Sequence, residues 1–309
     1  MSARWSERYN RCEYRGRVMS AVVVRDVPRL TRRVHDGHKG TYGKVLVVAG
    51  SREMGGGAVL CGRAALRGGA GVVQVASPAD AQPIVAASYP GYTTFAIRQH
   101  ADGTFGDGTA EEVIELARAA DVVAMGPGLG REAGTGEFVR SVLAGLGETP
   151  TVLDADGLFA VSPFRKEFAS RTAAIVMTPH PGEFARLTGT PVTKTDRERE
   201  DQAVAFAKRF GGVMLLKGSA TLVTDGTRLY RNTTGNPGMA TGGSGDVLAG
   251  IIAAIIGQGL SAFDAGVLGA WTHGRAGDLG AAVLGQTSLN ATDLLDYLPA
   301  AFRELESHW

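Results

Sequence analysis

The sequence predicts an α/β protein with a mainly parallel central sheet, helices on both faces of the sheet, and a β-hairpin near residues 220–231. Three observations support this class. Short apolar runs without polar alternation are typical of strands buried on both faces. Stretches with helical spacing separate several of these runs, as expected for a sheet built from strand–helix units. The 309 residues are enough for one large core.

The predicted elements alternate along the chain. Apolar β-rich runs predict strands over residues 44–49, 72–76, 121–124, 151–153, 173–177 and 213–216. Helical spacing predicts helices over residues 58–67, 110–119 and 135–146. The dipeptide Asp225-Gly226 lies between two β-prone runs and favours a tight hairpin turn. After Gly245 the pattern predicts helices near residues 246–257, 262–281 and 291–306.

The composition excludes several classes of protein. Hydrophobic residues make up 44% and charged residues 20% of the chain, and the net charge is +1, which is typical of a folded domain and gives no general attraction to nucleic acid. Two cysteines cannot form a disulfide framework, so we expect a reducing, cytoplasmic setting. The longest apolar run, Val247–Ile256, is too short to span a membrane.

The first 37 residues differ from the rest. They contain nine arginines and four acidic residues, a balance of +5, which leaves 1 − 5 = −4 for the remainder. Such a segment is either a basic arm for an acidic partner or a poorly ordered extension. The second interpretation is favoured. The predicted organisation is therefore an extension over 1–37 and one domain over 38–309.

The most informative segment is rich in glycine. Six glycines lie between Asn232 and Gly250, and a predicted helix follows directly. Free backbone N–H groups and the positive end of a helix dipole then meet at Gly243, Ser244 and Gly245, an arrangement that suits an anion. Asp246 either complements the dipole or faces a group that receives phosphate. The second interpretation is favoured, because the first does not require the glycines.

Other polar motifs follow predicted strands, whose carboxyl ends usually meet at a ligand-binding edge. His180 lies in a proline-fixed loop, which favours contact with a ligand, while Glu183 either caps a helix or holds a metal-bound water. Asp154 and Asp156 are each a helix cap or a ligand group. Residues 217–221 line a nucleotide site or form a solvated turn. The chain has neither a Walker A motif nor a clean dinucleotide fingerprint.

The ordered set of motifs resembles the ADP/ATP-dependent NAD(P)H-hydrate dehydratases of the ribokinase-like superfamily, over about residues 38–300. The resemblance rests on His38–Lys44, Ala49–Ser51, Gly126–Gly130, Asp154–Asp156, Thr178–Glu183, Leu216–Gly218 and Gly235–Asp246. Many relatives carry an additional epimerase domain. The length of this chain leads us to expect the stand-alone dehydratase form.

The resemblance implies an activity. This family restores NADH and NADPH from the S epimers of their hydrates. A phosphoryl group from ADP or ATP, with Mg²⁺ bridging the nucleotide phosphates, converts the C6 hydroxyl of the ring into a leaving group, and phosphate is released with AMP or ADP. Arginine outnumbers lysine 26 to 6, which fits a bacterial chain and favours ADP. The resemblance also implies a homotetramer.

The resemblance also implies residue roles. Asp246 accepts the proton of the C6 hydroxyl, and the backbone N–H groups of Gly243, Ser244 and Gly245 hold the transferred phosphoryl group. Implied contacts to the hydrated cofactor come from Ala58, Gly128, Gly130, His180 and Asp246. Implied contacts to the nucleotide come from Lys217, Gly218, Ser219, Ala220, Thr221 and Gly245. No protein ligand is assigned to Mg²⁺.

The same residues are compatible with other functions. A kinase of the same superfamily, acting on a hydroxymethylpyrimidine or hydroxyethylthiazole type of vitamin precursor, would use the same loop and Asp246 but leave a stable phosphate ester. A nucleotide-binding or regulatory module would show no turnover, and Asp246→Asn would then change nothing measurable. A Rossmann oxidoreductase is disfavoured by the missing fingerprint.

Overall fold

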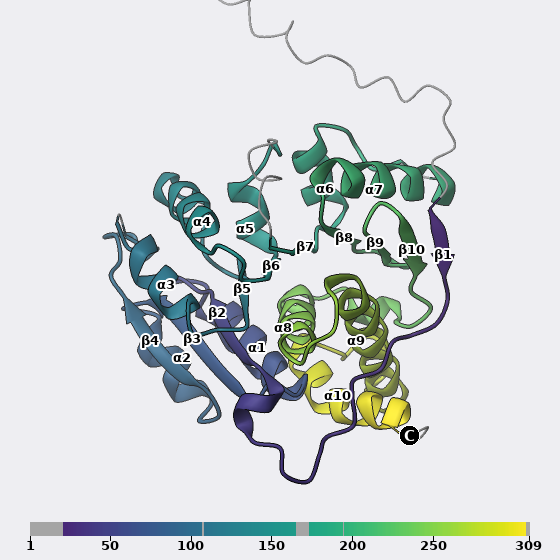
Figure 1. Cartoon of the computed structure of the whole chain (residues 1–309), viewed down its shortest axis with the longest axis horizontal. Helices are drawn as coiled ribbons and strands as arrows, with labels where there is room; N and C mark the ends of the chain where they lie inside the picture. Colours follow the sequence, from purple (N-terminus) through teal and green to yellow (C-terminus); the bar gives the residue numbers. More distant parts are fainter. Residues whose placement is uncertain (1–20, 107, 165–172, 194, 307–309) are drawn as a thin grey trace, which may run out of the picture.

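One sheet runs through the computed structural model, which describes residues 21–106, 108–164, 173–193 and 195–306 (Figure 1). Its strands within these residues are β1 (Val22–Val24), β2 (Lys44–Val48), β3 (Val72–Pro78), β4 (Thr93–Ile97), β5 (Val122–Met125), β6 (Thr151–Leu153), β7 (Ile175–Met177), β8 (Val213–Leu216), β9 (Leu222–Thr224) and β10 (Arg228–Arg231). Their spatial order is β1-β10-β9-β8-β7-β6-β5-β2-β3-β4. Neighbouring strands from β8 to β4 are parallel, whereas β9 is antiparallel to both β8 and β10. The predicted fold class and hairpin are thus confirmed.

Helices cover both faces of the sheet (Figure 1). One face carries α1 (Gly55–Arg67), α2 (Gln82–Ser88), α8 (Ser244–Gly257), α9 (Ala262–Leu284) and α10 (Ala291–Glu306). The other carries α3 (Ala110–Ala117), α4 (Ala133–Gly145), α5 (Ala155–Ala160), α6 (Pro181–Thr188) and α7 (Asp196–Phe210). Val45 and Val47 of β2 belong to the first core, and Leu46 and Val48 to the second. A strand buried on both sides is therefore apolar without alternation.

The strand order reverses beside β2. From β2 the chain runs outward through β3 to β4, then returns to β5 on the other side of β2 and continues toward β8. The loops that follow β2 and β5 consequently lead to different parts of the sheet. In open α/β sheets, ligands bind beyond the strand carboxyl ends at such a switch point.

The structure differs from the sequence prediction at the boundary of the first segment. Residues 1–20 of the predicted extension lie outside the described residues. Val22–Val24, however, forms β1, which pairs in parallel with Arg228–Tyr230. The predicted extension therefore contributes an edge strand to the sheet of the domain. Main-chain hydrogen bonds to β10 hold this strand in place. The charge balance of the segment, on which the prediction rests, carries no information about such hydrogen bonds.

Several elements were not predicted. Strand β4 is an edge strand with mostly exposed or half-buried residues, so its apolar signal is weak. Helix α7 begins with the charged run Asp196–Asp201, which hides its buried face. Two short 3₁₀ helices, Lys39–Tyr42 and Pro237–Met239, complete the described elements. No helix in the described ranges combines the length and the apolarity needed to cross a bilayer.

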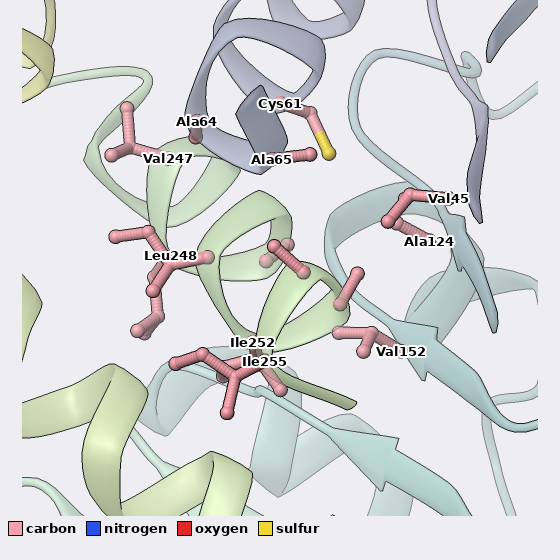
Figure 2. Packing of buried hydrophobic residues seen from close by; sticks show 14 of the residues in the cluster. Val45, Cys61, Ala64, Ala65, Ala124, Val152, Val247, Leu248, Ile252 and Ile255 are labelled. Atoms are coloured by element: carbon pink, nitrogen blue, oxygen red, sulfur yellow. The ribbon is translucent and has the colours of Figure 1, made fainter. Parts of the chain in front are cut away.

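Helix α8 packs closely on α1 (Figure 2). Cys61, Ala64 and Ala65 of α1 face the fully apolar side of α8, and all three are buried. Small residues are required here, because a Cβ atom at Gly250 would overlap the carbonyl oxygen of Cys61 and lie 2.8 Å from the Ala64 Cβ. Helix α8 also buries Ile251, Ile252 and Ile255, each contributing about 1.5–3 kcal/mol of hydrophobic stabilisation. The core thereby fixes the position of the α8 N-terminus.

Gly250→Ala should destabilise the protein by about 1–3 kcal/mol, because the added methyl group must push α8 away from the backbone of α1. Thermal unfolding followed by circular dichroism measures the change as a fall in Tm. Gly56→Ala in α1 is the matched control, since no atom lies within 4 Å of the position of its Cβ. Equal Tm values for Gly250→Ala and the parent protein would contradict the close packing.

Candidate active site

The N-terminus of α8 presents free backbone donors. Gly243 is the N-cap with φ +88°, a left-handed conformation that glycine adopts without strain. It has no side chain to accept hydrogen bonds from the first helical N–H groups, which also have no intrahelical acceptors. Asp246 lies in the first turn, as predicted. The Ser244 N–H already donates to the Thr241 carbonyl over 3.4 Å, so the predicted anion-binding arrangement relies mainly on the N–H groups of Gly243 and Gly245.

His273 supports this helix end from α9. Its Nε2 atom lies 2.9 Å from the carbonyl oxygen of Ser244 and 3.2 Å from the Ser244 Oγ. Burial lowers the pKa of His273 to about 4, so the ring is neutral at pH 7 and Nε2–H can donate to the carbonyl. Sequence analysis missed this residue, because it lies 29 positions beyond its partner in a helix without any local motif.

A buried ion pair lies at the carboxyl ends of β6 and β8. Lys217 Nζ is 2.8 Å from Asp154 Oδ1, and the Thr178 hydroxyl donates to the same oxygen over 2.7 Å. Asp154 is 1% exposed. It is the N-cap of α5, yet its side chain makes no cap hydrogen bond. Of the two roles left open by the sequence, the cap is therefore not observed, and the side chain pairs with Lys217 instead.

Gly245 brings the helix end against this pair. A Cβ atom on Gly245 would lie 3.0 Å from Lys217 Nζ and 3.3 Å from Asp154 Oδ2. That Asp154 Oδ2 atom is buried and has no hydrogen-bond partner among the described residues. The predicted anion hole, Lys217 and an unpaired carboxylate oxygen therefore converge at one place.

Asp246 lies among charges that oppose its ionisation. Burial raises its pKa to about 7, the Asp154 charge adds to this, and Lys217 acts in the opposite direction. Asp156 and Glu183 raise the pKa further. A carboxylate with a pKa close to 7 suits a proton acceptor at neutral pH, because it is a stronger base than an ordinary aspartate and is still substantially ionised.

His180 and Glu183 cap α6. His180 Nδ1 accepts hydrogen bonds from the N–H groups of Gly182 and Glu183 at 3.0 and 3.3 Å, and the Glu183 carboxylate accepts from the His180 N–H at 2.7 Å. Burial, with help from Lys217, lowers the pKa of His180, and burial raises that of Glu183. Glu183 thus caps the helix while its Oε2 lies 3.8 Å from Lys217 Nζ. The His180 ring is half-exposed, and its Nε2 lies 3.5 Å from Glu183 Oε1, so the ring faces the same carboxylate that caps the helix.

The loops after β2 and β5 lie next to each other and adjoin Asp246. The Gly50 N–H donates to the Pro127 carbonyl over 2.8 Å. A Cβ on Gly57 would lie 3.3 Å from Asp246 Oδ2 and 3.2 Å from Pro127, so these loops and the start of α1 adjoin the carboxylate. Ala58, predicted to contact the hydrated cofactor, is fully buried, and its methyl group lies close to Gly50.

The two glycines predicted to contact the substrate have different surroundings. Gly128 has φ +64° and approaches the Met54 backbone so closely that a Cβ would overlap it. The Gly130 N–H donates to Asp156 Oδ2 over 3.1 Å, and Arg131 Nε donates to Asp156 Oδ1 over 2.8 Å. The Gly130 N–H is therefore already engaged. Asp156 organises the loop after β5.

The segment 217–221 is fastened by Arg199 of α7. Its guanidinium donates to the carbonyl oxygens of Leu216, Lys217 and Ala220 at 3.2–3.3 Å. The Thr221 hydroxyl donates to the Gly218 carbonyl, while Gly218 and Ser219 are exposed. The predicted nucleotide loop, which begins with Lys217, is therefore a turn whose conformation is fixed by hydrogen bonds. Arg199 was not predicted, because its partners lie 17–21 residues later in the chain.

The carboxylates permit a hydrated cation but no protein cage. No group of three or more His, Cys, Asp or Glu residues in the described ranges is arranged to hold a metal ion. The unpartnered Asp154 Oδ2 and the Glu183 carboxylate are hard oxygen donors. Mg²⁺ typically keeps several waters and uses one or two carboxylates together with nucleotide phosphates. These residues fit that mode of binding.

Comparisons with known proteins agree on one family. The profile of the NAD(P)H-hydrate dehydratase family matches residues 45–300. The chain is 42% identical to a bifunctional NAD(P)H-hydrate repair enzyme of Moorella thermoacetica, over 94% of this chain and 54% of that protein. It is 38% identical to an ADP-dependent (S)-NAD(P)H-hydrate dehydratase of Neisseria meningitidis, over 80% of each chain. The chain spans about half the length of the bifunctional relatives.

The structure resembles a solved relative as well. A crystal structure of the ADP/ATP-dependent NAD(P)H-hydrate dehydratase from Bacillus subtilis, crystallised with ATP and Mg²⁺, superposes with a TM-score of 0.75 at 29% identity. The match covers 89% of this chain and 94% of the Bacillus chain. Sequence profile, relatives and fold agree with the resemblance drawn from the motifs: the chain belongs to the NAD(P)H-hydrate dehydratase family.

Proposed function

We propose that this protein dehydrates the S epimers of hydrated NADH and NADPH with consumption of ADP or ATP, and thereby restores the reduced cofactors. The observation that carries this proposal is the Asp246 carboxylate, with a pKa raised to about 7, at the open N-terminus of α8 and close to Lys217. A proton acceptor beside phosphate-binding amides is what phosphorylation of a hydroxyl requires. The names of the relatives support the same chemistry.

In the proposed first step, the C6 hydroxyl oxygen attacks the terminal phosphorus of the nucleotide. The new O–P bond forms as the bond to the leaving nucleotide phosphate breaks, and Asp246 accepts the hydroxyl proton. The N–H groups of Gly243, Ser244 and Gly245 stabilise the charge on the transferred group, because the helix dipole and free donors favour an anion there. Proton transfer can be late in a loose transition state.

In the second step, the C6–O bond breaks and inorganic phosphate leaves, carrying the electron pair of that bond. The lone pair of the ring nitrogen assists its departure. Loss of a ring proton then restores the dihydropyridine. The net result is dehydration of the cofactor, with AMP formed from ADP or ADP formed from ATP. Phosphate leaves far more readily than hydroxide, which is the reason for consuming a nucleotide.

The nucleotide is proposed to bind along residues 217–221 and Gly245. Lys217 carries a positive charge there, since its carboxylate neighbours raise its pKa although burial acts against them. Mg²⁺ would be held by the nucleotide phosphates together with Asp154 Oδ2 and water near Glu183, and when bound it neutralises phosphate charge. His180 Nε2 and the backbone around Gly128 are proposed to face the hydrated cofactor.

The deciding experiment supplies hydrated NADH or NADPH with ADP or ATP and follows two products. We expect recovery of the near-ultraviolet absorbance of the reduced nicotinamide together with stoichiometric inorganic phosphate. A small-molecule kinase would instead leave a stable phosphate ester with its own substrate and would not restore the absorbance. Absence of both products with either nucleotide would refute the proposal. Homotetramer formation and a cytoplasmic setting stay predictions.

Asp246→Asn should reduce kcat by about 10²–10⁴-fold, because an amide cannot accept the hydroxyl proton. Binding of ADP, measured by calorimetry, should persist. The Tm should not fall, since the variant no longer buries a charge. Asp264→Asn, an acid in the first turn of α9 outside the site, is the matched control. Full activity of Asp246→Asn would remove the proposed proton acceptor.

The activity should fall as the pH is lowered through about 7, because protonated Asp246 cannot accept a proton. Asp154→Asn should move this acidic limb of the kcat/KM profile to lower pH. The Asp154 charge raises the pKa of Asp246, and its loss also leaves Lys217 less neutralised, which acts in the same direction. The position of the limb is measured independently of the absolute rate. An unchanged limb, or one displaced upward, would contradict the proposed coupling.

A further inference from the structure

A separate cavity lies beyond the loop that follows β5. Its volume is about 240 Å³, and Gly130, Arg131, Thr135, Arg140 and Asp156 are among the residues that line it. This volume is large enough to hold several water molecules. It is below the range of about 300–1,000 Å³ typical of sites for whole drug-sized ligands. The cavity therefore suits one polar group of a larger ligand.

The cavity is lined by donors with remaining capacity. Arg131 Nε–H donates to Asp156, and the Arg131 guanidinium carbon lies 5.2 Å from the centre of the Phe159 ring. Arg140 Nη1–H donates to the Ala160 carbonyl. A guanidinium has five N–H donors, so most donors of both arginines stay available. Two carboxylates also line the cavity. Asp156 accepts from Arg131 and from the Gly130 N–H, and Glu132 is an exposed residue.

Thr135 provides an independent indication of a ligand. It lines the cavity from the first turn of α4 and is 1% exposed, yet its hydroxyl has no hydrogen-bond partner in the part of the chain that the structure describes. A buried hydroxyl without a partner costs roughly 1–3 kcal/mol. The N-cap of α4, Glu132, provides no side-chain cap hydrogen bond, so the helix end also has free N–H groups. An anion in the cavity would satisfy these donors together.

The cavity lies within reach of the proposed reaction centre. Pro127 adjoins Gly57, whose Cβ position is 3.3 Å from Asp246 Oδ2. Gly130, on the cavity wall, follows Pro127 by three residues, a span of at most about 10 Å. The distance is therefore within the length of a dinucleotide whose nicotinamide ring lies at Asp246.

We infer that this cavity is a phosphate subsite that binds the dinucleotide part of the substrate through Arg131, Arg140, the Thr135 hydroxyl and the N-terminus of α4. The inference rests on the proposed function for the identity of the ligand. The phosphate belongs either to the diphosphate bridge, which both cofactors have, or to the 2′-phosphate, which only NADPH has. Both are phosphate groups, but the diphosphate occurs in both hydrated cofactors, whereas the 2′-phosphate occurs only in the NADPH hydrate.

Thr135→Val tests the subsite, because valine has nearly the same shape and lacks the hydroxyl. With ADP saturating, KM for the hydrated cofactor should rise about tenfold, as expected for a lost hydrogen bond to a charged group, while kcat changes less than about twofold. Arg140→Gln should act in the same direction. Arg118→Gln, an exposed arginine of a surface pair outside the cavity, controls for loss of charge. Equal increases for NADH and NADPH hydrates would assign the diphosphate, and an increase for the NADPH hydrate alone would assign the 2′-phosphate.

A purely structural Thr135 gives the opposite result. Removing an unsatisfied buried hydroxyl would then leave KM unchanged and leave Tm equal or higher, and this outcome would overturn the subsite. If the parent protein shows no turnover, the proposed function fails separately. The subsite is then judged from equilibrium binding of intact NADH and NADPH, followed by their fluorescence. Equal Kd values for the parent and Thr135→Val, or no binding to either, would overturn the subsite as well.

Discussion

The charge balance around Lys217 is the constraint on which the site depends. One ammonium group lies 2.8 Å from Asp154 and 3.8 Å from Glu183, and its charge also acts on Asp246. Three carboxylates therefore compete for a single buried cation. Because charges interact strongly away from water, the carboxylate that is not paired with Lys217 holds its proton more tightly than usual. Asp246 is in that position: burial raises its pKa most, and the neighbouring carboxylates raise it further.

Close backbone packing makes this cluster possible. Gly57 and Gly245 lie on two sides of Asp246, and side chains at either position would approach the carboxylates or Lys217. Gly250 lets α8 rest directly on α1. The apolar remainder of α8 contributes hydrophobic stabilisation that offsets the burial of polar groups at its N-terminus. The helix thus combines a stable core segment with an end that carries the proposed proton acceptor.

The support of the site extends beyond the groups proposed to react. His273 holds the Ser244 carbonyl, and Arg199 holds three carbonyls of the loop after β8. Both residues come from helices on opposite faces of the sheet, so the two cores jointly position the site. Thr178 and Lys217 share one oxygen of Asp154, which leaves the other oxygen free for a ligand.

Local patterns in the chain predicted the parallel sheet, the hairpin, the helix that begins near Asp246 and the family, because apolar periodicity, turn residues and ordered glycine motifs can be recognised without the fold. They also put Lys217, His180 and Asp246 beyond strand ends or at a helix start. The tertiary structure alone decided that Asp154 pairs with Lys217, that His273 and Arg199 support the loops, and that β1 joins β10. These partners are far apart in sequence, and their energies arise from burial and distance, which exist only once the chain has folded.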